Sequence, residues 1–168
     1  MSKGRWAAAV AAVLALLVAA GASARSGTRH VDRKNIVIGL NVIKQGKQVI
    51  ALVPVTINDK GPFTFALDTG ASRSLMDAAV AKRVGAPKSG SAGKIAGVNS
   101  VKKAGLVKVR SWRVGTVKLP ATDLVSSNLP FGNAYIGVQG LLGSDMLSRF
   151  DVVTIDYRKQ QLRLHPRG

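Results

Sequence analysis

The sequence contains no cysteine and no glutamate, and it has only two histidines, His30 and His165. Without cysteine the chain can form no disulfide, no thiolate metal site and no lipid-modified cysteine. His30 lies in a polar stretch near the N-terminus, and His165 lies close to the C-terminus. The sequence therefore gives no support to a histidine-dependent catalytic triad or to a histidine-rich metal site.

Phosphate-binding motifs are absent as well, because the chain has neither a GxGxxG segment nor a Walker loop. We expect no nucleotide cofactor, no metal and no other cofactor. Aromatic residues make up 5% of the chain and do not alternate with basic residues, so nothing predicts specific binding of nucleic-acid bases. The chemistry that remains is that of carboxylates, and all eight acidic residues are aspartates.

The N-terminus has the features of an export signal. Lys3 and Arg5 form a positive segment, residues 6–20 are uncharged and apolar, and Ala22-Ser23-Ala24 matches a signal-peptidase site. We expect cleavage there and export to the periplasm or the medium. The alternative is an uncleaved segment that anchors the protein to the membrane, although the uncharged run is only marginally long enough to span a bilayer.

The expected organisation is a signal peptide over residues 1–24, a flexible polar leader over 25–34 and one domain over 35–168. This length suffices for one hydrophobic core and not for a second full domain. Because disulfides are excluded, the exported domain must rely on that core or on a partner chain.

Basic residues outnumber acidic residues by 25 to eight. Between Asp77 and Asp123 the sequence has no acid and ten basic residues, which are Lys82, Arg83, Lys88, Lys94, Lys102, Lys103, Lys108, Arg110, Arg113 and Lys118. Such a charge attracts anionic membrane or envelope surfaces, acidic peptides or nucleic acid without sequence specificity. The alternative is a basic surface that keeps the protein soluble and has no dedicated ligand.

Hydrophobic patterning favours strands. Residues 36–43 and 48–57 are rich in Val and Ile and flank a turn-like KQGK segment, which predicts a β-hairpin. Residues 63–67, FTFAL, alternate so that Phe63 and Phe65 share a face, which predicts a further strand.

The remainder of the chain predicts two short helices, over residues 74–85 and 144–150, with Ser144 or Asp145 capping the second. Residues 89–105 contain four glycines and predict a glycine-tipped hairpin. Residues 151–166 predict a closing hairpin around Arg158 and Lys159.

Asp68, in the segment ALDTGAS, differs from the other aspartates. It follows the apolar strand directly, and Thr69-Gly70 then turns the chain, so the strand is expected to carry its carboxylate into the interior. A carboxylate that loses water there needs backbone donors or a charge partner, or else it stays protonated. The other seven aspartates have ordinary explanations as turn residues, helix caps and strand ends.

The segments ALDTGAS, GLLG and SDMLSRFDVVTIDY together resemble the retropepsin-like aspartic proteases, which comprise the retroviral proteases and their small bacterial relatives. The resemblance runs from about Val49 to Leu164. It implies an all-β fold, a closed barrel or sandwich with a glycine-rich flap hairpin and one or two short helices.

The resemblance also implies roles for individual residues. Asp68 would be the catalytic carboxylate, Thr69 would hydrogen-bond across a two-fold axis, and Gly70 would let the backbone approach the substrate. Ala71 would be the small residue that keeps the cleft open. Ser72 stands where retroviral enzymes carry another aspartate, so a contact between Ser72 and substrate is not implied.

Two further elements follow from the same resemblance. Leu141, Leu142 and Gly143 would form the element that packs beneath the active-site loop. Ile95, Ala96, Gly97 and Val98 would belong to the flap that covers a peptide substrate.

The motif occurs once, whereas the chemistry needs two carboxylates. The resemblance therefore implies a homodimeric endopeptidase that hydrolyses peptide or protein substrates with water activated between two copies of Asp68. The alternative is a weakly active or inactive module of the same fold that binds anionic envelope components or peptides.

Overall fold

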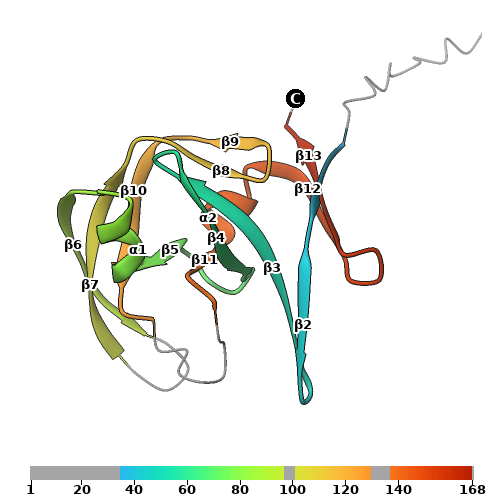
Figure 1. The fold of residues 1–168 in the computed structure, drawn as a ribbon, viewed down its shortest axis with the longest axis horizontal. Helices are drawn as coiled ribbons and strands as arrows, with labels where there is room; N and C mark the ends of the chain where they lie inside the picture. The colour runs from blue at the N-terminus through green and yellow to red at the C-terminus, as the bar shows by residue number, and fades with distance from the viewer. Residues whose placement is uncertain (1–34, 97–100, 130–136, 168) are drawn as a thin grey trace, which may run out of the picture. The chain divides into compact units, whose positions relative to one another are not determined.

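The computed structural model describes residues 35–96, 101–129 and 137–167, which belong to one compact unit, Arg33–Gly168. The expected signal peptide and leader lie outside the described residues. The described chain is mostly β-strand, so the all-β prediction is confirmed (Figure 1). Its strands are β1 (Ile36–Gly39), β2 (Asn41–Gln45), β3 (Gln48–Ile57), β4 (Lys60–Leu67), β5 (Leu75–Asp77), β6 (Lys88–Ala96), β7 (Val101–Val109), β8 (Trp112–Val114), β9 (Val117–Leu119), β10 (Thr122–Ser127), β11 (Gly140–Leu142), β12 (Phe150–Asp156) and β13 (Gln161–Pro166).

A three-stranded antiparallel sheet has the order β1-β13-β12, and its closing β12–β13 hairpin confirms the prediction for residues 151–166. The prediction of one strand over residues 36–43 is wrong. The chain breaks at Leu40, whose N–H donates to the carbonyl of Gln160 at 2.8 Å. β1 then pairs with β13, and only β2 forms the expected hairpin with β3.

The larger sheet has the order β6-β7-β10-β5-β11-β4-β3-β8-β9, with β2 also paired to β3. The expected closed barrel is not observed, because among the described residues β6 and β9 do not pair with each other. β9 has three residues, and Pro120 follows it directly, so the backbone lacks the N–H that would extend this edge.

One face of the large sheet packs against α1 (Ala78–Arg83), α2 (Ser144–Leu147) and the inner face of the small sheet. This core contains Phe63, Phe65, Met76, Trp112 and Leu162, each at most 2% exposed. The buried Trp112 indole donates to the carbonyl of Pro120 at 2.8 Å. The predicted strand over residues 63–67 is confirmed, because its two phenylalanines lie in this core.

The opposite face of the large sheet carries a second set of apolar side chains. Successive strand pairs place them side by side in a row across six strands, and we call this set the apolar row: Leu106, Val125, Leu75, Leu141, Ala66 and Leu52. All six are buried or half-buried, yet none belongs to the core cluster. The sheet therefore has two apolar faces.

The helix predicted over residues 74–85 is shorter than expected. Leu75–Asp77 form β5, which pairs with β10 and β11, and helix α1 begins only after Asp77. Asp77 caps α1 by accepting the N–H of Ala79 at 2.8 Å. No helix among the described residues is long and apolar enough to cross a membrane.

Candidate active site

The loop between β4 and β5 begins with Asp68. Its Oδ1 accepts hydrogen bonds from the N–H groups of Gly70 at 3.0 Å and Ala71 at 3.1 Å. The backbone N–H of Asp68 donates to the carbonyl of Leu142 at 3.1 Å. These bonds fix the carboxylate and the backbone on which it is mounted.

Asp68 is half-buried, so the strand does not carry its carboxylate fully into the interior as expected. The backbone donors that a dehydrated carboxylate requires are nevertheless present on Oδ1. Among the described residues, Oδ2 makes no hydrogen bond or ion pair. Among the bonds that the structure describes, the loop thus holds one carboxylate oxygen and not the other.

The next residues of the loop lie at the surface. Thr69, Gly70 and Ser72 are exposed, and Ala71 is half-buried. A Cβ atom on Gly70 would lie 3.3 Å from Oδ1 of Asp68, so a side chain here would crowd the carboxylate. The predicted role of Thr69 concerns a partner chain and stays a prediction, and no contact between Ser72 and substrate is predicted.

The predicted Leu-Leu-Gly element lies beneath this loop as β11 and the residue after it. β11 runs parallel to β4, with Leu141 beside Ala66 and Leu142 beside Leu67. At Gly143 the loop comes so close that an added Cβ would lie 2.8 Å from the carbonyl oxygen of Ala71. Gly143 is required here because the two backbones touch.

Helix α2 holds the loop in a way that the sequence did not reveal. Its N-cap is Gly143, without a side-chain cap, so the prediction that Ser144 or Asp145 caps it is wrong. Ser144 instead donates its N–H at 2.8 Å and its hydroxyl at 3.0 Å to the carbonyl of Ala71. The carboxylate of Asp145 accepts hydrogen bonds from the N–H and the hydroxyl of Ser74. The hydroxyl of Ser74 in turn accepts the N–H of Gly143 at 2.9 Å.

Asp68 lies on the face of the sheet that carries the apolar row. Side chains alternate along β4, so Thr64, Ala66 and Asp68 point to the same side, opposite Phe65 and Leu67. The neighbouring strand places Leu141 next to Ala66. The carboxylate therefore stands at the border of an apolar surface.

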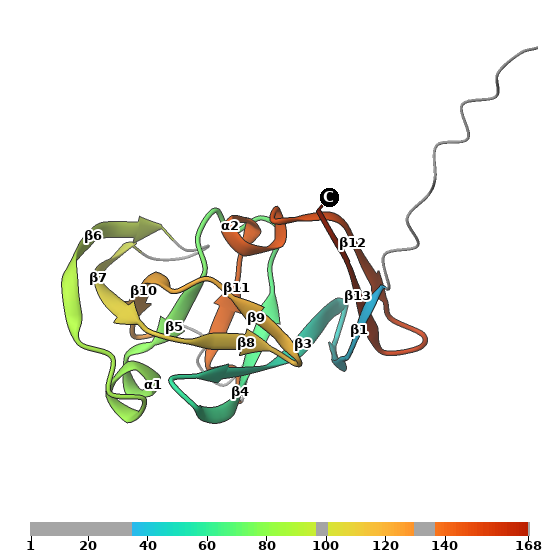
Figure 2. The same cartoon turned by 90° about the horizontal axis from the view of Figure 1, so that it is seen from above.

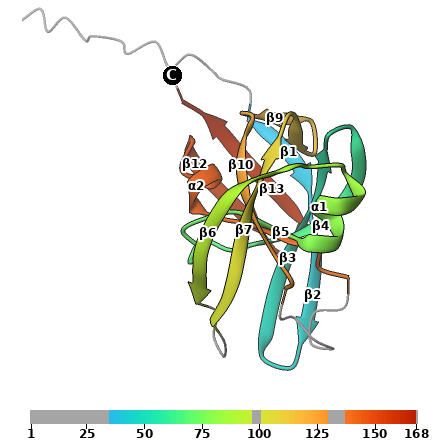
Figure 3. The ribbon, with the colours of Figure 1, turned by 90° about the vertical axis from the view of Figure 1, so that its left-hand side faces the viewer.

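The glycine-rich hairpin predicted over residues 89–105 is confirmed as β6 and β7 (Figure 3). Ile95 pairs with Lys102, and Ala96 pairs with Val101, which places these backbone positions near the tip. The predicted flap residues Gly97 and Val98 lie outside the described residues. The role of the hairpin as a flap stays a prediction.

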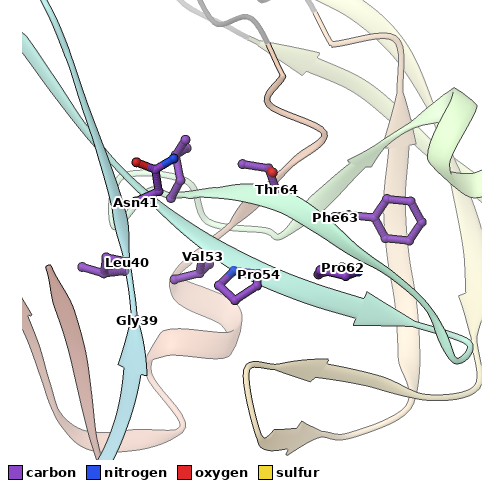
Figure 4. A pocket seen from close by; sticks show the side chains of 9 residues that line it. Gly39, Leu40, Asn41, Val53, Pro54, Pro62, Phe63 and Thr64 are labelled. Atoms are coloured by element: carbon purple, nitrogen blue, oxygen red, sulfur yellow. The ribbon is translucent and has the colours of Figure 1, made fainter.

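A shallow hollow of about 280 Å3 lies on the β3–β4 hairpin, where β1 passes into β2 (Figure 4). Pro54, Pro62 and Thr64 line it. Thr64 precedes Asp68 by four residues, or about 13 Å of strand. The hollow is therefore separate from the carboxylate, and we assign it no role in catalysis.

Comparison with known proteins agrees with this geometry. The sequence profile of the aspartyl protease family matches residues 53–146, which include Asp68, β11 and most of α2. No curated protein matches the sequence significantly.

Two solved structures align with this chain. A retropepsin-like aspartic protease from Rickettsia conorii is 22% identical, with a TM-score of 0.50 over 77% of this chain and 92% of its own. The EIAV protease in complex with the inhibitor HBY-793 is also 22% identical, with a TM-score of 0.49 over 63% of this chain and 92% of its own. The family profile and the Rickettsia structure thus assign the chain to the aspartyl protease family with a retropepsin-like all-β fold.

Proposed function

We propose that the chain is an aspartic endopeptidase whose active unit is a homodimer. The observation that carries the proposal is the loop of Asp68, where two backbone N–H groups hold Oδ1 and Thr69 and Gly70 are exposed. Each chain has one such loop, and the reaction needs two carboxylates. Two exposed loops that meet across a two-fold axis would supply them.

In this dimer the two Asp68 carboxylates would share one proton, as close carboxylate pairs in aspartic proteases do. The ionised carboxylate takes a proton from water while the water oxygen attacks the scissile carbonyl carbon. The protonated carboxylate gives its proton to the carbonyl oxygen. The C–N bond of the tetrahedral diol then breaks as the nitrogen accepts the proton that the first carboxylate took from water. The second carboxylate takes a proton from a diol hydroxyl, which yields a carboxylic acid and an amine and restores the shared proton.

Each loop contributes more than its carboxylate. The N–H groups of Gly70 and Ala71 orient the carboxylate because both donate to Oδ1. Leu141 and Leu75 of the apolar row are half-buried and leave part of their surface for a ligand. We therefore propose substrates with large apolar residues beside the scissile bond.

The N-terminal sequence supports export, to the periplasm or the medium. Lys3 and Arg5, the apolar run after them and the Ala-x-Ala site form the pattern of a cleavable signal. N-terminal sequencing of the mature protein from cell fractions tests this proposal. A soluble protein that still begins at Met1 would rule out cleavage, and an intact membrane-bound chain would favour the anchor.

A binding module without activity is the other candidate. It would not need the bonds that orient the Asp68 carboxylate, so their presence favours catalysis. The test is to compare the wild-type chain with Asp68→Asn in peptide-library cleavage and to measure the mass of both in solution. We expect both proteins to be dimers in solution and only the wild type to cleave peptides. Equal cleavage by both proteins would exclude a role for Asp68.

A further inference from the structure

Four exposed basic residues lie on segments that meet at the β3–β4 turn, at the opposite end of β4 from Asp68. They come from three segments, namely the start of β4, the last turn of α1 and the residue after β7. Figure 2 shows α1 beside the turn that precedes β4. We call this set the basic patch, and its members are Lys60, Lys82, Arg83 and Arg110.

Hydrogen bonds hold these three segments together. Lys60 Nζ donates to the carbonyl of Arg83 at 2.9 Å, which ties the turn to the end of α1. Asn58 bridges all three, because its Nδ2 donates to the carbonyl of Val84 at 3.3 Å and its Oδ1 accepts the N–H of Arg110 at 3.0 Å. Since Asn58 is buried, the patch is built on a fixed framework and not on a loose loop.

The side chains of the basic patch are exposed and belong to no ion pair. All four of its side chains are exposed, and Asp59 is the one acid within the turn itself. In the part of the chain that the structure describes, the ion pairs join Arg163 to Asp156 and Arg167 to Asp151, so no member of the patch belongs to one. Clustered like charges without ion-pair partners favour an anionic ligand.

We propose that the basic patch docks the folded domain on an anionic lipid bilayer. Each Lys or Arg near such a surface adds to the attraction, which acts within about 10 Å of the lipid charges. The patch has no exposed aromatic side chain on which a base could stack, since Phe63 lies under Arg83 and is 2% exposed. The expected apolar signal or anchor segment would bring the domain to a membrane.

The location of the basic patch would let the domain dock on a bilayer with its Asp68 loop accessible. Lys60 begins β4, and Asp68 follows its end, so the two are separated by about 25 Å of extended strand. A domain that docks through the patch would hold its Asp68 loop away from the lipid. Membrane docking and peptide cleavage can therefore coexist, and neither proposal depends on the other.

Vesicle binding by the full chain tests the proposal. Sedimentation with phosphatidylcholine vesicles, with and without phosphatidylglycerol, would compare the wild type with Lys82→Glu/Arg110→Glu. The matched control is Lys44→Glu/Lys47→Glu, which changes the same charge at the exposed β2–β3 turn, at the opposite end of β3. Neutral vesicles measure any binding through the N-terminal apolar segment.

We expect the patch variant to bind phosphatidylglycerol vesicles at least about tenfold more weakly than wild type, with the control within about twofold. Equal losses in both variants, or none in the patch variant, would overturn the proposal. Patch-dependent binding to duplex DNA without binding to the vesicles would overturn it too. Lys82→Gln/Arg110→Gln, a milder change, gives the same comparison if the patch variant does not fold.

Discussion

Asp145 accepts two hydrogen bonds from Ser74, one from its N–H at 2.9 Å and one from its hydroxyl at 2.7 Å. Ser74 ends the loop that begins with Asp68, and Asp145 lies in the first turn of α2. Because the hydroxyl of Ser74 also accepts the N–H of Gly143, the helix, the turn before it and the loop form one polar network. This network fixes the far end of the Asp68 loop.

Replacing Ser74 by alanine would leave the N–H of Gly143 without its acceptor in a site where Ser74 is 1% exposed. We expect a loss of about 1–3 kcal/mol in the free energy of unfolding, measured with urea. Ser72→Ala, in the same loop and exposed, should change it by less than about 0.5 kcal/mol. Equal stability of the two variants would show that the network does not hold the loop.

Gly143→Ala tests the contact between the two backbones. The new methyl group would meet the carbonyl oxygen of Ala71 and the carbonyl carbon of Arg73, each at 2.8 Å, and neither can move alone. We expect a loss of about 1–3 kcal/mol or more. Gly39→Ala is the control, because nothing lies within 4 Å of its added Cβ. If thermal unfolding shifts equally in both variants, the close approach at Gly143 is not what requires glycine.

Leu141 and Leu142 are neighbours in sequence that point to opposite faces of the sheet. Leu142→Ala removes a core side chain that is 2% exposed and should cost about 2–5 kcal/mol of stability. Leu141→Ala should cost much less, yet lower kcat/KM for substrates with large apolar residues by about tenfold or more. If Leu141→Ala leaves kcat/KM unchanged, the apolar row does not contribute to substrate binding.

The pKa of Asp156 lies below its ordinary value of 3.8, chiefly because the N–H of Lys159 donates to its carboxylate, aided by the charges of Lys159 and Arg163. A folded-state pKa below the unfolded value means that the ionised carboxylate stabilises the fold. This contribution is complete above the unfolded pKa and is lost as pH falls through the folded pKa.

We therefore expect wild type to be slightly more stable than Asp156→Asn near neutral pH, with the difference vanishing in acid. Unfolding measurements on both proteins between about pH 7 and pH 2 would show this. A stability difference between the two proteins that grows as the pH falls would contradict a lowered pKa for Asp156.

The sequence predicted what depends on local pattern. Alternation in residues 63–67 identified β4, and the position of Asp68 after it identified the carboxylate. The break at Leu40 was not predictable, because residues 36–43 have the same pattern on both sides of it. β1 pairs with β13, which is distant in sequence, whereas β2 pairs with β3, which follows directly after the turn.

The supporting contacts of the site were hidden for a related reason. Ser74 and Asp145 are 71 residues apart, and an acid at the start of a helix is ordinarily interpreted as a cap. Only the position of α2 against the loop reveals that Asp145 bonds to Ser74. The local composition likewise predicts a helix over β5, but pairing with β10 and β11 outweighs that composition.

The most direct test of the proposed active site mixes wild-type and Asp68→Asn chains. The two proteins would be unfolded together and refolded at one wild-type chain to about nine variant chains, which leaves about one tenth of wild-type chains paired with each other. If each site needs two copies of Asp68, peptide cleavage per wild-type chain falls about tenfold. Cleavage per wild-type chain that is unchanged by the variant would contradict the shared site.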